Sequence, residues 1–424
     1  MSNLKQHGNL RINADRLWSR HMEMAKIGAI PGDGNCRLAM SAEDAEARSL
    51  FASWCHAAGM SLQVDAAGNM FALRPGSNPT LPPIAAGSHL DTQPHGGRFD
   101  GISGVLAALE VVETLNDAGI ETEAPIAVIN WTNEEGVRFG PGLMGSSWFV
   151  GNITDEVLAA IQDAEGTSFI AEAATRGWCG LQAAGAFPMG AFFELHIEQG
   201  PQLEALGDQV GIVTSVQGLK WLDVVVTGMD GHAGTTPLDH RHDALLTAAR
   251  MLVALNETGR AFGQDARVSV GRLTTATDGP STIVGEAQLV IDLRHPDAKV
   301  LSQLADECEA ICRAIAAEAG CGISVSERIS IAPKHFNQSC IDALATAAQD
   351  LGFQHSEIAS GALHDACNIA DVTPTAMVFV PCRDGISHNV REYASREDLA
   401  AGTSVLLQAM LAKAGLAGSE KVAA

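Results

Sequence analysis

The sequence predicts a large α/β domain with a smaller α+β domain inserted into it. The runs "PPIAAGSHLD" and "APIAVINWTNEEG" are apolar and end in charged residues, as buried parallel strands do when they carry side chains to a site. Between them, "SGVLAALEVVETLNDAG" has helical spacing, so the three segments form a βαβ unit. From about residue 214 the expected order changes to β-α-β-β-α-β, that of a ferredoxin-like sandwich.

Length and composition limit the class of protein. The 424 residues suit about two domains, and 46% hydrophobic residues supply a core. A net charge of −23 disfavours nucleic acid and anionic membranes as partners. The nine cysteines include no C-x-x-C pair, the N-terminus has no apolar signal region, and no run of about 18 apolar residues occurs. We therefore expect a soluble, cytoplasmic protein with reduced thiols.

The remaining elements follow in order. Ser41 and Gly59 are expected to bound a helix, and residues 61–76 alternate around a turn at Gly68, as in a hairpin. The inserted domain is expected to span residues 214–331, which leaves 1–213 and 332–424 to a discontinuous catalytic domain. The catalytic part after the insertion is expected to hold a helix over 339–353, a strand over 374–381, a helix over 395–415 and a frayed tail over 418–424.

The stretch "GSHLDTQPHGGRFDGISG" contains the first candidate metal ligands. His89 and Asp91 share a face of a strand, so His89 can bind a metal while Asp91 holds its other ring nitrogen. Asp100, eleven residues after His89, precedes the predicted helix, and a carboxylate there can bridge two cations. The alternative is a helix-capping Asp100 beside a buried, structural His89.

Three further segments carry the rest of the candidate set. Adjacent carboxylates at Glu134 and Glu135 repel, which suits a metal site where one Glu binds the metal and the other accepts a proton from a water; the alternative is a solvated acidic turn. His196 lies in "ELHIEQGP", where a structural histidine is the alternative. His388 lies in a loop of Gly, Ser and Asn residues, where no hydrophobic pattern indicates a place in the core. Histidines and carboxylates from four segments are typical of a dizinc hydrolase.

These segments together resemble the M20 metallopeptidase clan, in its amidase/hydantoinase/carbamoylase branch. That branch contains N-carbamoyl-L-amino acid amidohydrolases and allantoate amidohydrolases. The resemblance covers nearly the whole chain and includes "GSHLDTQPHGGRFDG", "NEEGVRFGPGLMGS", "HIEQGP", "GHAGTTPLDHRHDAL", "SGALHDACNIA" and "GISHNVREY". It implies an M20-type catalytic α/β domain, with the inserted ferredoxin-like domain acting as lid and dimerisation domain.

The resemblance also implies two divalent metal ions and their ligands. The metals would be zinc, manganese, cobalt or nickel, and the donor set does not choose among them. Asp100 would bridge both ions, and Glu134 would be the general base and later the acid. One ion would be held by His89, Asp100 and His196, and the other by Asp100, Glu135 and His388.

Substrate recognition is implied in the same way. The substrate would be a small carboxylate with a ureido group, bound by Gln199 and, through its carboxylate, by Arg294. His232 would stabilise the oxyanion from the neighbouring subunit of a homodimer. The remaining implied contacts are Ser281, Gly361 and Ala362. Two positions depart from the family pattern, Ser281 in place of an Asn and Leu363 in place of a Gly, so the reaction class is better determined than the substrate.

The sequence thus predicts a hydrolase that cleaves the C–N bond of N-carbamoyl-L-amino acids or related ureido acids, releasing ammonia and CO2. The alternatives are an allantoate amidohydrolase and, disfavoured by "HIEQGP", an M20 dipeptidase or aminoacylase. A non-catalytic scaffold conflicts with the intact Glu134 and Glu135. A carbamoylase with a cysteine nucleophile is disfavoured, because no cysteine in the sequence has flanking residues that support this role.

Overall fold

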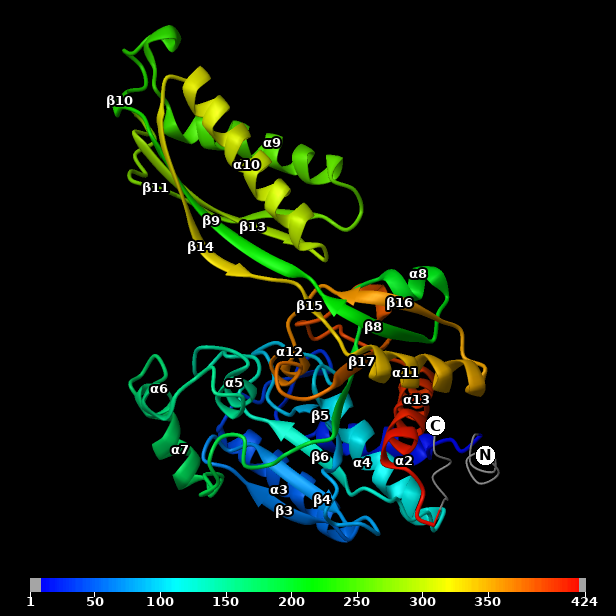
Figure 1. The fold of residues 1–424 in the computed structure, drawn as a ribbon. Coiled ribbons are helices and arrows are strands. Elements are labelled where there is room, and N and C mark those ends of the chain that lie inside the picture. The colour runs from blue at the N-terminus through cyan, green and yellow to red at the C-terminus, as the bar shows by residue number, and fades with distance from the viewer. Residues whose placement is uncertain (1–8, 419–424) are drawn as a thin grey trace. The chain divides into compact units, whose positions relative to one another are not determined.

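The computed structural model describes residues 9–418 and divides the chain into two compact units. Unit 1 comprises the described residues up to Thr214 and from Phe336 onward, and unit 2 comprises residues 215–335 (Figure 1). Residues 419–424, most of the segment expected to fray, lie outside the described residues. No helix within 9–418 has both the length and the apolar character needed to cross a membrane.

Unit 1 is built on a nine-stranded mixed sheet, of which the edge strand β15 belongs to unit 2. The strands run in the order β15-β8-β17-β7-β5-β6-β4-β3, and β16 pairs with β8 outside this path. The four central strands, β17, β7, β5 and β6, are parallel and fully buried. The strands are β3 (Ser61–Val64), β4 (Met70–Arg74), β5 (Ile84–His89), β6 (Ile126–Trp131), β7 (Ala191–Ile197), β8 (Val210–Val216), β15 (Lys334–His335), β16 (His355–Ser360) and β17 (Thr375–Val380), with a separate pair β1 (Ala29–Ile30) and β2 (Gly34–Asn35).

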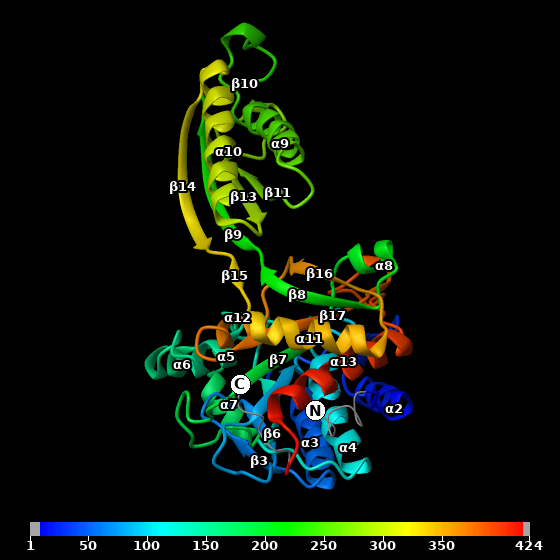
Figure 2. The same ribbon diagram turned by 45° about the vertical axis from the view of Figure 1, so that its right-hand side comes forward.

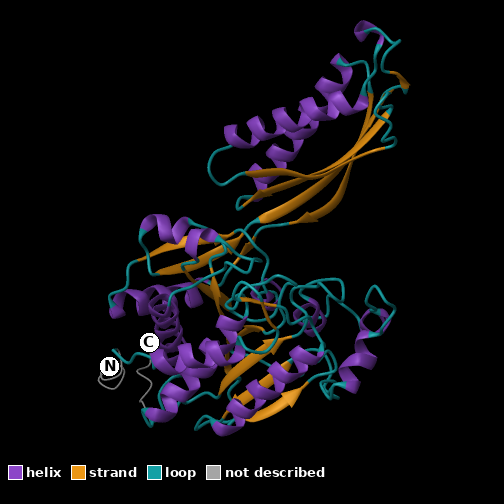
Figure 3. Ribbon diagram, turned by 180° about the vertical axis from the view of Figure 1, so that it is seen from behind, coloured by secondary structure: helices purple, strands orange, loops and turns teal. Residues whose placement is uncertain are grey.

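Helices pack against this sheet (Figures 2 and 3). Helix α4 contacts β5, β6 and β7 and is buried on nearly every side, as its apolar composition requires. The predicted βαβ unit and the 61–76 hairpin are confirmed. The helices are α2 (Ala14–Met24), α3 (Ala42–Ala57), α4 (Ile102–Asp117), α5 (Met144–Phe149), α6 (Asp155–Ala160), α7 (Phe169–Thr175), α8 (Gln202–Leu206), α11 (Gln338–Leu351), α12 (Asp365–Ile369) and α13 (Arg396–Ala414), with the 3-10 turn η2 (Arg383–Gly385).

The strand register brings the chemistry-bearing segments to one edge of the sheet. In the β5–β6 pair His89 lies opposite Trp131, and in the β17–β7 pair Val380 lies opposite Ile197. These residues are the last of their strands, so the four parallel strands end together. Catalytic groups gather at the carboxyl ends of parallel strands because the following loops converge there.

Unit 2 has the predicted order β-α-β-β-α-β. Its four antiparallel strands lie in the order β11-β13-β9-β14, and two helices cover one face of the sheet (Figure 1). A short pair, β10 with β12, was not predicted. The elements are β9 (Gly218–Thr227), β10 (Gly231–His232), η1 (Leu238–His240), α9 (Ala244–Ala261), β11 (Arg267–Thr275), β12 (Thr282–Ile283), β13 (Glu286–His295), α10 (Ala298–Glu318) and β14 (Gly322–Ile331). All nine cysteines of the chain lie in described segments, and none forms a disulfide.

Candidate metal centre

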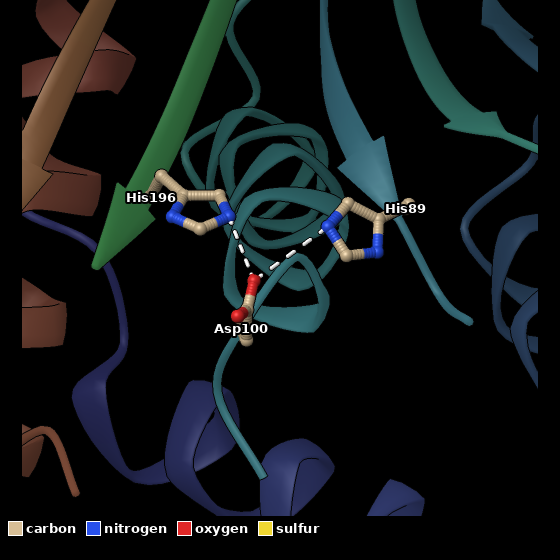
Figure 4. A group of neighbouring side chains, drawn as sticks. All are labelled: His89, Asp100 and His196. Atoms are coloured by element: carbon tan, nitrogen blue, oxygen red, sulfur yellow. Dashed lines mark ion pairs between the residues drawn. The ribbon is translucent and has the colours of Figure 1, made fainter. Parts of the chain in front are cut away.

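Three side chains from distant segments meet where β5 and β7 end (Figure 4). His89 ends β5, His196 lies on β7, and Asp100 lies in the loop before α4. Asp100 Oδ1 is 3.6 Å from His89 Nε2 and 3.0 Å from His196 Nε2. All three residues are buried. The N-cap of α4 is Gly101 and no side chain caps this helix, so the capping alternative for Asp100 is wrong.

The orientation of both imidazole rings is set by backbone carbonyls. His89 Nδ1 is 2.9 Å from the carbonyl oxygen of Asp91, and His196 Nδ1 is 2.9 Å from that of Ile197. A carbonyl only accepts, so each Nδ1 carries a hydrogen and each Nε2 is the nitrogen that can bind a proton or a metal. In the structure His196 Nε2 accepts a hydrogen bond of 3.2 Å from the backbone N–H of Gly101.

The expected contact between the Asp91 carboxylate and His89 is not formed. The Asp91 Oδ1 atom is 4.0 Å from His89 Nδ1, and the backbone carbonyl takes its place. The carboxylate instead accepts hydrogen bonds of 3.2 Å from the backbone N–H groups of Glu134 and Glu135. Asp91 therefore positions the loop that carries both glutamates, a role that strand periodicity does not reveal.

A second group shares Asp100 through its other oxygen. His388 Nε2 lies 3.2 Å from Asp100 Oδ2 and 3.5 Å from Glu135 Oε2. In each of the two groups, one potential donor atom per residue lies within 4.8 Å of the others. Asp100 thus presents one oxygen to each group, which is the arrangement that a bridging carboxylate requires.

Glu134 borders the first group. Its Oε2 atom is 3.6 Å from His89 Nε2, and its side chain is only 11% exposed. The Glu135 side chain is 5% exposed and accepts a hydrogen bond of 2.6 Å from Gln93 Nε2. The alternative of a solvated acidic turn is therefore wrong, because both carboxylates point into the protein.

The charges at this edge shift several pKa values. Burial would raise the pKa of Asp100, but the neighbouring His196 and His388 hold it well below its usual range. Burial would lower the pKa of His196, but Asp100 raises it to about 9. The Asp100 hydrogen bond likewise raises the pKa of His388 to about 9. The shifts have a common cause, because a carboxylate and an imidazole held close together each favour the charged form of the other.

The pKa values of the two glutamates are raised, whereas that of Asp100 is lowered. Burial raises the pKa of Glu135 to about 7, and the charge of Asp100 adds to the effect. Burial and the charges of Asp365 and Glu135 raise the pKa of Glu134 well above its usual value. Buried carboxylates held this close together destabilise the folded protein unless cations offset their negative charge.

The residues present fit a pair of divalent cations. The Nε2 atoms of two oriented imidazoles, a shared carboxylate, a second carboxylate and a third imidazole are ligands suited to zinc, manganese, cobalt and nickel. Gly101 leaves space for this arrangement, since a Cβ at this position would lie 2.3 Å from His89 Nε2, and its φ of +69° favours glycine.

Several residues around the ligands were missed by sequence reasoning. Glu194, two residues before His196 on β7, accepts a hydrogen bond of 2.6 Å from Ser88 Oγ. Glu392 accepts hydrogen bonds from the loop that carries Asp100. For Glu194 a signal existed, because it shares a strand face with His196.

Gln199 lies within the centre. Its Nε2 donates to Asp100 Oδ2 at 2.8 Å and to Ser387 Oγ at 3.0 Å. Its φ is +57°, an uncommon value for a residue other than glycine. Gly361 and Ala362 follow β16 in unit 1, where Ala362 N donates to Ser360 Oγ at 3.1 Å. His95, in the same glycine-rich stretch as Asp100, is an exposed loop residue.

The remaining candidates lie in unit 2. His232 is exposed and pairs with Thr282 in the β10–β12 ribbon, next to Ser281, whose carbonyl accepts from Ala233 N at 2.8 Å. Arg294 on β13 faces Asp292 with two contacts of 3.0 Å. These residues belong to a different compact unit from the metal ligands.

Comparison with known proteins decides the family. Residues 85–412 match the model of peptidase family M20/M25/M40. The chain belongs to this family. Among M20 proteins it is 44% identical to an amidase of the hydantoinase/carbamoylase family from Burkholderia multivorans, with a TM-score of 0.92 and coverage of 96% of this chain and 98% of that one. The predicted family and its branch are therefore confirmed.

The chain is also similar to proteins whose names give an activity. The chain is 45% identical over 403 residues to an N-carbamoyl-L-amino-acid amidohydrolase of Rhizobium meliloti, which covers 95% of this chain and 97% of the relative. It is 31% identical to a ureidoglycolate hydrolase of Arabidopsis thaliana, over 94% of this chain and 86% of the relative. The prediction of a hydrolase is confirmed.

Proposed function

We propose that this M20 protein hydrolyses N-carbamoyl-L-amino acids, or closely related ureido carboxylic acids, with two bound divalent metal ions. Water cleaves the ureido C–N bonds, so an N-carbamoyl amino acid and one water give the amino acid, CO2 and ammonia. One observation carries the proposal: two donor groups share Asp100, one oxygen each, with the Glu134 carboxylate beside them. The Rhizobium meliloti relative, named for this activity, supports the substrate class.

The chemistry follows from groups of unit 1. Divalent cations, when bound, polarise the scissile carbonyl and lower the pKa of a nearby water. Glu134 accepts the proton of the attacking water and then delivers it to the leaving nitrogen, because a buried carboxylate with a raised pKa is suited to both transfers. Glu135, His89, His196 and His388 hold the cations with Asp100, and Asp91 holds the backbone of both glutamates.

Substrate recognition is proposed to use both units. Gln199 binds the ureido group, and the Arg294 guanidinium binds the substrate carboxylate, for which its planar fork is suited. His232 stabilises the oxyanion from the partner subunit of a homodimer. Ser281, Gly361 and Ala362 complete the substrate contacts, which are those that the family resemblance implies.

A second candidate is a different ureido acid. The Arabidopsis thaliana relative is named a ureidoglycolate hydrolase, and its substrate contains the same ureido carbon beside a carboxylate. Ser281 and Leu363 depart from the family pattern at recognition positions. Allantoate and ureidoglycolate are therefore the competing substrates.

A substrate panel tests the proposal. The purified protein is loaded in turn with Zn, Mn or Co, freed of excess metal, and given N-carbamoyl-L-amino acids, their D-isomers, allantoate or ureidoglycolate, with ammonia as the readout. We expect release from N-carbamoyl-L-amino acids, and loss of activity on chelation that added metal restores. Release from allantoate alone would move the protein to the second candidate. No ammonia from any member, by protein that holds two metal equivalents, would contradict both.

A further inference from the structure

Glu392 is a buried carboxylate that lies next to the candidate metal ligands but is not one of them. Its residue is 2% exposed, and it follows His388 by four positions in the loop after β17. Its three hydrogen bonds indicate what it does.

One oxygen of Glu392 holds the loop that presents Asp100. Glu392 Oε1 accepts hydrogen bonds of 3.0 Å from the backbone N–H of Phe99 and from that of Asp100. The two partners lie 293 and 292 residues away in the sequence. An ionised carboxylate that accepts from two backbone N–H groups makes stronger bonds than a neutral acceptor does.

The other oxygen holds the loop that presents His388. Glu392 Oε2 lies 3.1 Å from Ser387 Oγ, and the same hydroxyl lies 3.0 Å from Asp100 Oδ2. Ser387 directly precedes His388 in the chain. The carboxylate therefore connects the segment of the bridging ligand with the segment of a ligand in the second group.

Gly97 provides independent evidence that this place is built for a carboxylate. A Cβ at position 97 would lie 2.1 Å from Glu392 Oε1 and 2.4 Å from Glu392 Cβ. Contacts this short are not tolerated, so a side chain at position 97 would displace the Glu392 carboxylate. The glycine pair at 96–97 thus includes one residue whose missing side chain makes room for Glu392.

We propose that Glu392 is a positioning residue that holds Asp100 and His388 at the separation a shared metal pair requires. The inference rests on the metal centre proposed above. Outer hydrogen-bond partners of metal ligands typically change metal affinity or activity about 10–100-fold when they are substituted. The expected loss is therefore in metal affinity and in kcat, with KM nearly unchanged, because Glu392 is buried and is not one of the proposed substrate contacts.

Three variants of the full chain test this role. Glu392→Gln keeps the size but offers only one acceptor oxygen, and Gly97→Ala displaces the carboxylate without removing it. Glu110→Gln is the matched control: Glu110 is also buried and accepts a backbone N–H, that of Asn13 at 3.0 Å, but it binds no segment that carries a ligand. The measurements are Co²⁺ affinity, the visible absorption of the Co²⁺ protein, kcat, KM and the unfolding temperature.

We expect Glu392→Gln and Gly97→Ala to weaken binding of at least one Co²⁺ about 10–100-fold and to alter its absorption spectrum. Glu110→Gln should lower only the unfolding temperature. Wild-type affinity and spectrum in both test variants, or in Gly97→Ala alone if Glu392→Gln does not fold, would overturn the role of Glu392. Wild-type protein that binds no Co²⁺ would instead overturn the proposed metal centre, so the two failures are distinct.

Discussion

The two units hold their candidate residues in different ways. In unit 1 the ligand His89 is buried and its ring is held by a backbone carbonyl, while Asp100 contacts three histidines. In unit 2 His232 is exposed on a two-residue strand, and the Arg294 side chain is 34% exposed. A group held by several contacts keeps one position, which transition-state chemistry needs, whereas an exposed group can adjust to a ligand. The comparison teaches that the proposed metal ligands of unit 1 are mostly held in place by packing and hydrogen bonds, whereas the candidates of unit 2 are more exposed and can adjust to a ligand.

The sharpest test of this division is Glu134→Gln in unit 1. Loss of a general acid and base is expected to lower kcat by about 10²–10⁴-fold, because Glu134 is the proposed proton carrier. Metal content should stay at the wild-type value, since Glu134 is not a proposed ligand. Steady-state kinetics and metal analysis check both; full activity in Glu134→Gln would end the proposed mechanism.

His232→Ala in unit 2 should have a smaller but still large effect. Removal of one oxyanion donor typically costs about 10²–10³ in kcat. If the donor comes from a partner subunit, mixing His232→Ala with Glu134→Gln protein should restore roughly a quarter of wild-type activity, because half of the random dimers contain one complete site. The mixture is assayed after subunit exchange. A mixture as inactive as its components would show that His232 does not act across a dimer.

The stability of unit 1 should fall as the pH is lowered, and His21 should contribute to that fall. Complete burial lowers the pKa of His21 on α2 to about 4, against about 6.5 in the unfolded chain. The unfolded chain thus binds the proton first as pH falls, so the stability present above pH 6.5 is lost between about pH 6.5 and 4, by about 3 kcal/mol for this group. Urea unfolding across that range measures the loss. His21→Gln should have a shallower pH slope, and an unchanged slope would refute the assignment.

The mildest predicted effect belongs to Arg294→Lys in unit 2. The substitution keeps the charge but loses the planar fork, so carboxylate binding should weaken by about 2 kcal/mol, or roughly 30-fold in KM, with a smaller change in kcat. Arg294 is paired with Asp292 in the structure, so Asp292→Asn is a useful companion that removes the charge of this partner. Kinetics with one N-carbamoyl amino acid measure both variants. An unchanged KM in Arg294→Lys would remove Arg294 from the recognition role.

Many strands and helices of this protein could be predicted from the sequence, because the patterns that indicate them lie within short segments. Apolar runs that end in charged residues indicated β5 and β6, and helical spacing between them indicated α4. Ser41 caps α3 as expected, since its side chain accepts from Asp44 N. The family resemblance then assigned roles to individual residues, and the structure brings the five proposed metal ligands and Glu134 to one edge of the sheet.

Residue types and spacing therefore determined the fold class, the family and the inventory of donors. Only the tertiary structure decided which atom meets which: the carbonyl rather than the carboxylate of Asp91 on His89, one oxygen of Asp100 for each donor group, and Glu392 against a loop almost 300 residues away. The physical reason is that side-chain direction depends on rotamers and on contacts between distant segments. Periodicity along the chain records neither.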